Sequence, residues 1–130
     1  MDAYRNTLSF DEVEEYLSQV VEELPPELFG RLNGGVLLLP NVLLSKHSVG
    51  ADLYTLGTYH HEPYGLGRYI SIYYGSFEQV HGHESVPRQK KALRKVLLHE
   101  LTHHLESLAG MHDLEAEDEA FLDRYRRENS

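Results

Sequence analysis

The chain has 130 residues, a length that fits one ordinary domain with a core of its own. Hydrophobic residues make up 41% and charged residues 25%, which is close to the globular average and excludes wholesale disorder. The net charge of −9 argues against proteins that grip nucleic acid or anionic membranes through basic clusters. Because cysteine is absent, disulfides and thiolate ligands are excluded, and the nine histidines are the groups most suited to metal binding or proton transfer.

The first predicted element is a helix from about residue 9 to residue 24. Ser9 and Glu12 form the Ser-x-x-Glu pattern of a capping box. Apolar residues follow at helical spacing, at Phe10, Val13, Leu17, Val20, Val21 and Leu24. Pro25 and Pro26 end this helix, and Pro26 can open a short helical turn over residues 27–29.

The pattern of apolar residues in the middle of the chain predicts a small sheet of three strands. The first strand is the apolar run 36–39, the second is the weakly alternating segment 52–61, and the third is the alternating segment 68–74. The tyrosine-rich third strand is either an edge strand that pairs with an extended peptide or a place of aromatic packing. Residues 75–85 are predicted to be a loop.

A long helical pattern occupies the C-terminal third of the chain. Pro87 stands where a helix-opening proline belongs, the periodic pattern runs over 88–108, and Gly110 is placed as its C-terminal cap. A last helix is predicted over 114–127, with acidic residues at its start and arginine at its end. One helix, a small sheet and two further helices make a single α+β domain over residues 1–130.

The long helix carries the pattern His-Glu-x-x-His at residues 99–103. His99 and His103 lie on one helix face, about 6 Å apart along the axis, so that both imidazoles can reach one metal ion. Glu100 points about 100° away from His99, beside the ion rather than on it, where it can take a proton from a water that the ion activates. Zinc with a carboxylate base is the minimal machinery for hydrolysing an amide.

A catalytic zinc usually has three protein ligands, so a third donor is expected nearby. Asp113 is the predicted third ligand, because Gly110 would let the chain turn back toward the histidine pair. The same Asp113 also suits the N-cap of the last helix, and His112 is the alternative ligand. His104, which points about 100° away from His103, is expected to pack in the protein rather than to share the ion.

Several of these segments resemble the small bacterial zincin-like metallopeptidases, also called minimal zincins. The shared features are residues 24–28, the strand 68–75, the motif segment 96–104 with its doubled histidine, and Gly-Met-His-Asp at 110–113. The resemblance implies a minimal zincin-like core with an N-terminal helix, a small mixed sheet, a motif helix and a C-terminal helix. It also implies Zn²⁺, a third ligand at Asp113 and a peptidase activity. Here the interval between His103 and Gly110 is longer than the usual spacing by about one helical turn.

Three functions follow from these residues, and the leading one is a zinc-dependent peptidase acting on a peptide or protein. In it His99, His103 and Asp113 hold the zinc and Glu100 is the general base. The second is a non-catalytic zinc-binding interaction module, against which the intact Glu100 weighs. The third is a metal-dependent ribonuclease, because a related bacterial RNA-processing family uses a similar His-x-x-x-His helix. That family has glycine in place of Glu100, and the charge of −9 disfavours RNA.

Localisation is expected to be cytoplasmic. The N-terminus lacks a basic flank followed by an apolar run, and the longest apolar run, at 36–39, is too short to span a bilayer. We therefore expect neither a membrane partner nor a nucleic-acid partner.

Overall fold

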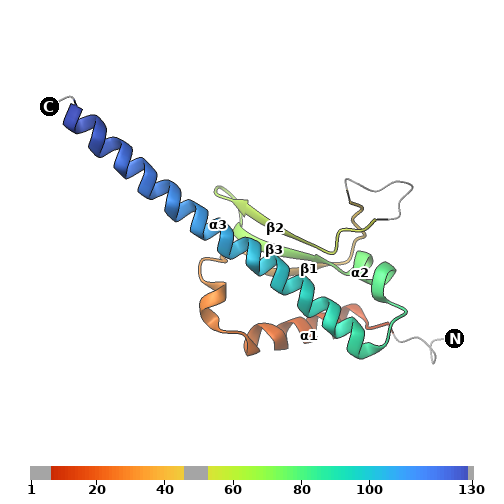
Figure 1. The fold of residues 1–130 in the computed structure, drawn as a ribbon. Coiled ribbons are helices and arrows are strands. Elements are labelled where there is room, and N and C mark those ends of the chain that lie inside the picture. The colour runs from red at the N-terminus through yellow and green to blue at the C-terminus, as the bar shows by residue number, and fades with distance from the viewer. Residues whose placement is uncertain (1–6, 46–52, 129–130) are drawn as a thin grey trace.

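The computed structural model describes residues 7–45 and 53–128, and from residue 111 onward it describes the backbone alone. Its elements confirm the predicted α+β class and the small mixed sheet. In chain order they are α1 (Phe10–Glu23), the 3₁₀ turn η2 (Pro26–Phe29), β1 (Gly35–Leu39), β2 (Gly57–Glu62), β3 (Gly67–Tyr73), α2 (Tyr74–His81) and α3 (Val86–Glu128), as Figure 1 shows.

The N-terminal helix begins at the predicted capping box. The Ser9 hydroxyl accepts a hydrogen bond from the Glu12 amide at 3.1 Å, and the Glu12 carboxylate accepts one from the Ser9 amide at 2.9 Å. The helix ends at Glu23, ahead of the two prolines, and Pro26 opens the 3₁₀ turn as expected. Two otherwise orphaned amides are thus satisfied at the start of α1.

The sheet has the strand order β1-β3-β2, with β1 parallel and β2 antiparallel to β3. The tyrosine-rich strand β3 is therefore the central strand, so that of the two roles predicted for it, that of an edge strand pairing with a peptide is wrong. Both of its hydrogen-bonding edges are occupied by neighbours, which leaves packing as the role of its aromatic side chains. The strand at the edge beside α3 is β2 (Figure 1).

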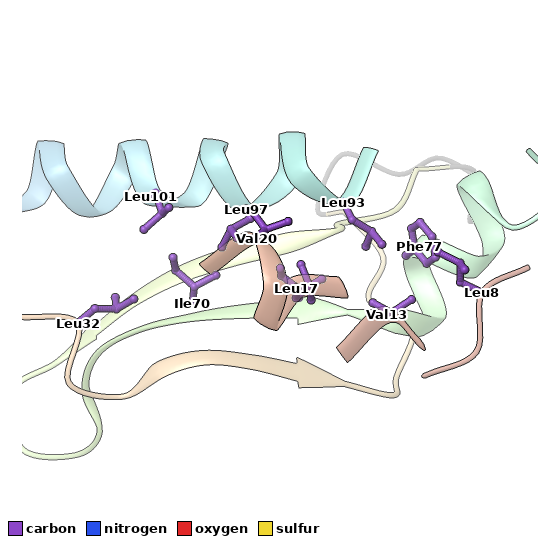
Figure 2. Packing of buried hydrophobic residues seen from close by; sticks show 11 residues of the cluster. Leu8, Val13, Leu17, Val20, Leu32, Ile70, Phe77, Leu93, Leu97 and Leu101 are labelled. Carbon is purple, nitrogen blue, oxygen red and sulfur yellow. The ribbon is translucent and has the colours of Figure 1, made fainter. Parts of the chain in front are cut away.

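The hydrophobic core lies between the sheet and the helices that cover one face of it (Figure 2). Alternation along β3 turns Ile70 and Ile72 toward these helices. Helical spacing on α1 and α3 supplies an apolar stripe from each helix. The buried residues of these stripes are Val13, Leu17 and Val20 of α1 and Leu93, Leu97 and Leu101 of α3.

Helix α2 was not expected, because residues 75–85 were predicted to be a loop. Phe77 is fully buried in the core, and this packing outweighs the weak local helix preference. Gly75 is present for a different reason: a Cβ atom there would lie 2.8 Å from the backbone of Asn41. The glycine therefore marks a close approach between segments and does not mark a loop.

The predicted helix end at Gly110 was wrong. Helix α3 continues as one helix from Val86 to Glu128, and its C-terminal part extends away from the rest of the protein (Figure 1). A glycine in a helix interior costs only about 1 kcal/mol relative to alanine, which strong helix formers on both sides can offset. Leu105, one turn beyond the buried Leu101 on nearly the same helix face, is 41% exposed.

In the described part of the chain, no helix combines the length and the apolar character that a membrane span requires.

Candidate metal centre

His99 and His103 come together on the exposed side of α3, as their spacing predicts. Their Nε2 atoms are 3.1 Å apart, and the two rings meet edge to face with centroids at 4.6 Å. Two imidazoles bound at about 2.0–2.1 Å to one tetrahedral zinc would hold their nitrogens about 3.3 Å apart. The pair therefore fits a zinc ion after an adjustment of a few tenths of an ångström.

Glu100 is buried next to this pair, with 6% of its surface exposed. Burial raises the pKa of its carboxyl group, whereas the neighbouring charges of His99, His103 and His60 lower it. The carboxyl group lies against the start of β2 and not along the histidine face. A group in this position can exchange a proton beside the metal without serving as a ligand.

Gly57, at the start of β2, lies directly against Glu100 and Val96. A Cβ atom at Gly57 would lie 2.8 Å from Cγ1 of Val96 and 3.2 Å from Cγ of Glu100. Only glycine lets the strand pass this close to the helix. An isolated glycine within a strand pattern is a known signal of such a close approach, but the sequence does not say what it approaches.

A hollow of about 770 Å³ opens beside the histidine pair, between β2 and α3. It brings together residues far apart in the sequence, including His61, Glu106 and Ser107, to which the sequence analysis gave no role in the site. The strand alternation turns Gly57, Tyr59 and His61 toward the helix. The full lining is Gly57, Thr58, Tyr59, His61, His99, Glu100, His103, Glu106 and Ser107.

His104 is fully buried, as predicted, and anchors the motif turn of α3 to two other segments. Its Nε2 lies 2.8 Å from the carbonyl oxygen of Gly30 and must donate a hydrogen to it. In the tautomer that carries its hydrogen on Nε2, Nδ1 accepts from the Tyr59 hydroxyl at 2.8 Å. Arg68 in turn donates to the Tyr59 oxygen at 3.0 Å and also to Ser107. These bonds hold β2 and β3 against the helix turn that carries His103.

The predicted third ligands, Asp113 and His112, have side chains that lie outside the described residues. Their backbone belongs to the continuous helix α3. In a straight helix Asp113 lies about 15 Å beyond His103 along the axis, so that coordination by Asp113 requires α3 to turn back near Gly110. Within residues 7–45 and 53–110, where side chains are described, no group of three or more acidic or histidine side chains converges on a metal position.

The histidines of β2 and α2 have local partners. His60 stacks on Tyr69 with ring centroids at 4.5 Å and is hydrogen-bonded to the Thr58 hydroxyl at 2.7 Å. His81 lies 2.9 Å from Glu84 within the turn that follows α2. Both histidines are therefore engaged by neighbouring side chains.

A solved structure resembles most of this chain. It is that of a conserved hypothetical protein from Thermus thermophilus, with 32% sequence identity and a TM-score of 0.66. The match covers 79% of this chain and 99% of that chain. The chain belongs to the family of this protein. No family model matches the sequence, and no curated protein matches it. The description of the Thermus protein names no activity, so that any function must be argued from the site.

Proposed function

We propose that the protein is a zinc-dependent peptidase with a minimal zincin-like fold, acting in the cytoplasm. The observation that carries the proposal is the juxtaposition of the His99–His103 pair, with Nε2 atoms 3.1 Å apart, and the buried carboxyl group of Glu100. An exposed pair of histidines that can hold one zinc ion, with a buried carboxyl group beside it, is the arrangement that amide hydrolysis needs. A purely structural metal site has no use for such an acid.

Each residue of the site has a distinct task in this proposal. His99 and His103 would hold the zinc, with Asp113 as the third ligand if α3 turns back near Gly110. When bound, zinc polarises a carbonyl group and lowers the pKa of a water molecule. Glu100 accepts a proton from the attacking water and delivers it to the departing amine. Burial raises the pKa of the Glu100 carboxyl group, and a raised pKa supports the return of the proton to the departing amine.

The substrate would lie along β2. This strand occupies the sheet edge next to the histidine pair, and its backbone groups on the side away from β3 can pair with an extended peptide. The pairing would lay the peptide across the hollow that Glu100 borders. Tyr59 and His104 would keep the strand in place, because their hydrogen bond joins β2 to the motif turn.

The test is peptide cleavage by zinc-loaded wild-type protein and by the Glu100→Gln variant. We expect the variant to retain zinc and to lose a factor of about 10² to 10⁴ in turnover, because it lacks the proton acceptor. Glu15→Gln is the control, since Glu15 is an exposed glutamate of α1 outside the hollow. Wild-type cleavage rates in Glu100→Gln would show that the mechanism is wrong.

A zinc-binding interaction module is the second candidate. Both candidates need donors beyond the His99–His103 pair, because no third ligand converges among the side chains described, which extend to residue 110. X-ray absorption at the zinc edge distinguishes the two candidates. A complete set of four protein ligands favours the module, whereas a coordination position left to solvent favours the peptidase.

A further inference from the structure

A second hollow lies on the other side of Glu100. Its volume is about 480 Å³, and it opens between residues 54–57 and the first half of α3. Gly57, His99 and Glu100 border this hollow as well as the one beside the histidine pair. The two hollows therefore adjoin along α3 at Glu100, and we call the two together the trough.

The two ends of this trough differ in chemistry. The walls of the second hollow are mostly apolar, with Leu56 and Tyr54 from the segment before β2 and Ala92 and Val96 from α3. Its polar members outside the first hollow are Thr55, His81 and Lys95. The first hollow instead has His61, Glu106 and Ser107 at its far end. We propose that the second hollow binds an apolar side chain of the substrate next to the bond that is cleaved. The position of the cleaved bond rests on the proposed peptidase function, whereas the binding of an apolar side chain does not.

The length of the trough agrees with an extended peptide. From Ala92 to Ser107 the helix rises by about 22 Å, which matches six or seven residues of extended chain at about 3.3 Å each. Val96 is one turn of α3, about 6 Å, from Glu100. A side chain seated against Val96 therefore belongs to a residue within two positions of a peptide bond that lies opposite Glu100.

The first experiment measures binding and needs no turnover. Short alanine peptides, blocked at both ends and carrying one central leucine or asparagine, are titrated into ¹⁵N-labelled protein, once with zinc and once with a chelator. We expect the leucine peptide to bind about tenfold more tightly, with the largest amide shifts at Leu56, Ala92 and Val96. Equal binding of both peptides under both conditions would overturn the proposal.

Two variants and a control locate the effect. Ala92→Phe fills the hollow and should remove the preference for leucine, whereas Ala109→Phe, at an exposed position of α3, should retain it. Val96→Ala enlarges the hollow and should move the preference toward phenylalanine, which keeps the test decisive if Ala92→Phe fails to fold. An unchanged preference in a folded Ala92→Phe or Val96→Ala protein would contradict the proposed binding site.

The second experiment measures cleavage of the same peptides by zinc-loaded wild-type protein. We expect kcat/KM to be about tenfold higher for the leucine peptide, with the cut within two residues of leucine. Equal cleavage of both peptides would refute the apolar subsite and leave the peptidase proposal intact. Tight binding of the leucine peptide with no cleavage of either would refute the peptidase proposal and leave the apolar site intact.

Discussion

Gly57 leaves no room for a side chain beside Glu100 at the junction of β2 and α3, because an added Cβ would lie 3.2 Å from Cγ of Glu100. The same Cβ would lie even closer to Val96, at 2.8 Å. The Glu100 side chain thus lies against β2 at Gly57, next to Val96 of its own helix. The position of the candidate base depends on a residue without a side chain, far from it in the sequence.

Replacing Gly57 by alanine should disturb the site through this contact. The methyl group must displace Val96 or Glu100, and overpacking of this kind costs about 1–3 kcal/mol in the free energy of unfolding. We also expect peptide turnover to fall more than zinc affinity, because His99 and His103 are not among the side chains that the added methyl group would meet. Urea unfolding measures the first effect, and peptide cleavage beside zinc titration measures the second. An unchanged free energy of unfolding would show that β2 moves away freely.

Gly110→Ala should have the opposite effect on stability. Gly110 lies within α3, its Cβ position meets no atom within 4 Å, and alanine is the better helix former by about 1 kcal/mol. We expect the metal-free protein to gain about 0.5–1 kcal/mol in urea unfolding. Zinc affinity provides a second result: if Asp113 binds zinc through a turn at Gly110, the variant binds zinc more weakly. A loss of stability without metal would contradict the continuous helix.

Tyr59→Phe should destabilise the protein because it removes the donor to Nδ1 of the buried His104. A buried acceptor left without a partner costs about 1–3 kcal/mol in the free energy of unfolding. Tyr69→Phe is the matched control, since it removes a hydroxyl bonded to Glu62 at the surface and should cost less than about 0.5 kcal/mol. If urea unfolding shows an equal loss of stability in the two variants, the hydrogen bond to His104 contributes no more than a surface hydrogen bond.

The capping box of α1 should make stability depend on pH. Hydrogen bonds from the backbone and the side chain of Ser9 lower the pKa of Glu12 below its ordinary value of 4.5. Because the folded-state pKa is the lower one, the stabilisation is present above 4.5 and is lost as the pH falls through the folded-state value.

The measurement is urea unfolding of wild type and Glu12→Gln at neutral pH and at a pH well below 4.5. We expect wild type to be more stable than Glu12→Gln at neutral pH, and we expect this difference between the two proteins to vanish in acid. Glu15→Gln, on the same helix, should show a smaller change between the two conditions. A difference that grows on acidification would have the wrong sign for this account.

The elements that were predicted correctly have local causes. The start of α1 depends on Ser9 and Glu12, three residues apart, and the histidine pair depends on the spacing of His99 and His103. Such signals lie within one or two helical turns, where sequence separation determines distance. The spacing therefore sufficed to place the pair on one face of a helix.

The elements that were missed depend on distant contacts. Helix α2 forms because Phe77 packs into a core built by other segments, and Gly75 fits against Asn41. The contributions of Gly57 and Tyr59 require the register of β2 against β3 and the place of both strands beside α3. No local pattern encodes these relationships. At Gly110 the local helix-ending signal was real but smaller than the helix preference of its neighbours.

The central claim is that the His99–His103 pair holds zinc, and elemental analysis of desalted protein after incubation with excess zinc tests it most directly. Wild type, His103→Ala and His83→Ala are compared at neutral pH; His83 is an exposed histidine outside the site. We predict about one zinc per chain in wild type and His83→Ala, and its loss in His103→Ala. Wild type without zinc, or His103→Ala with as much zinc as wild type, would contradict the account.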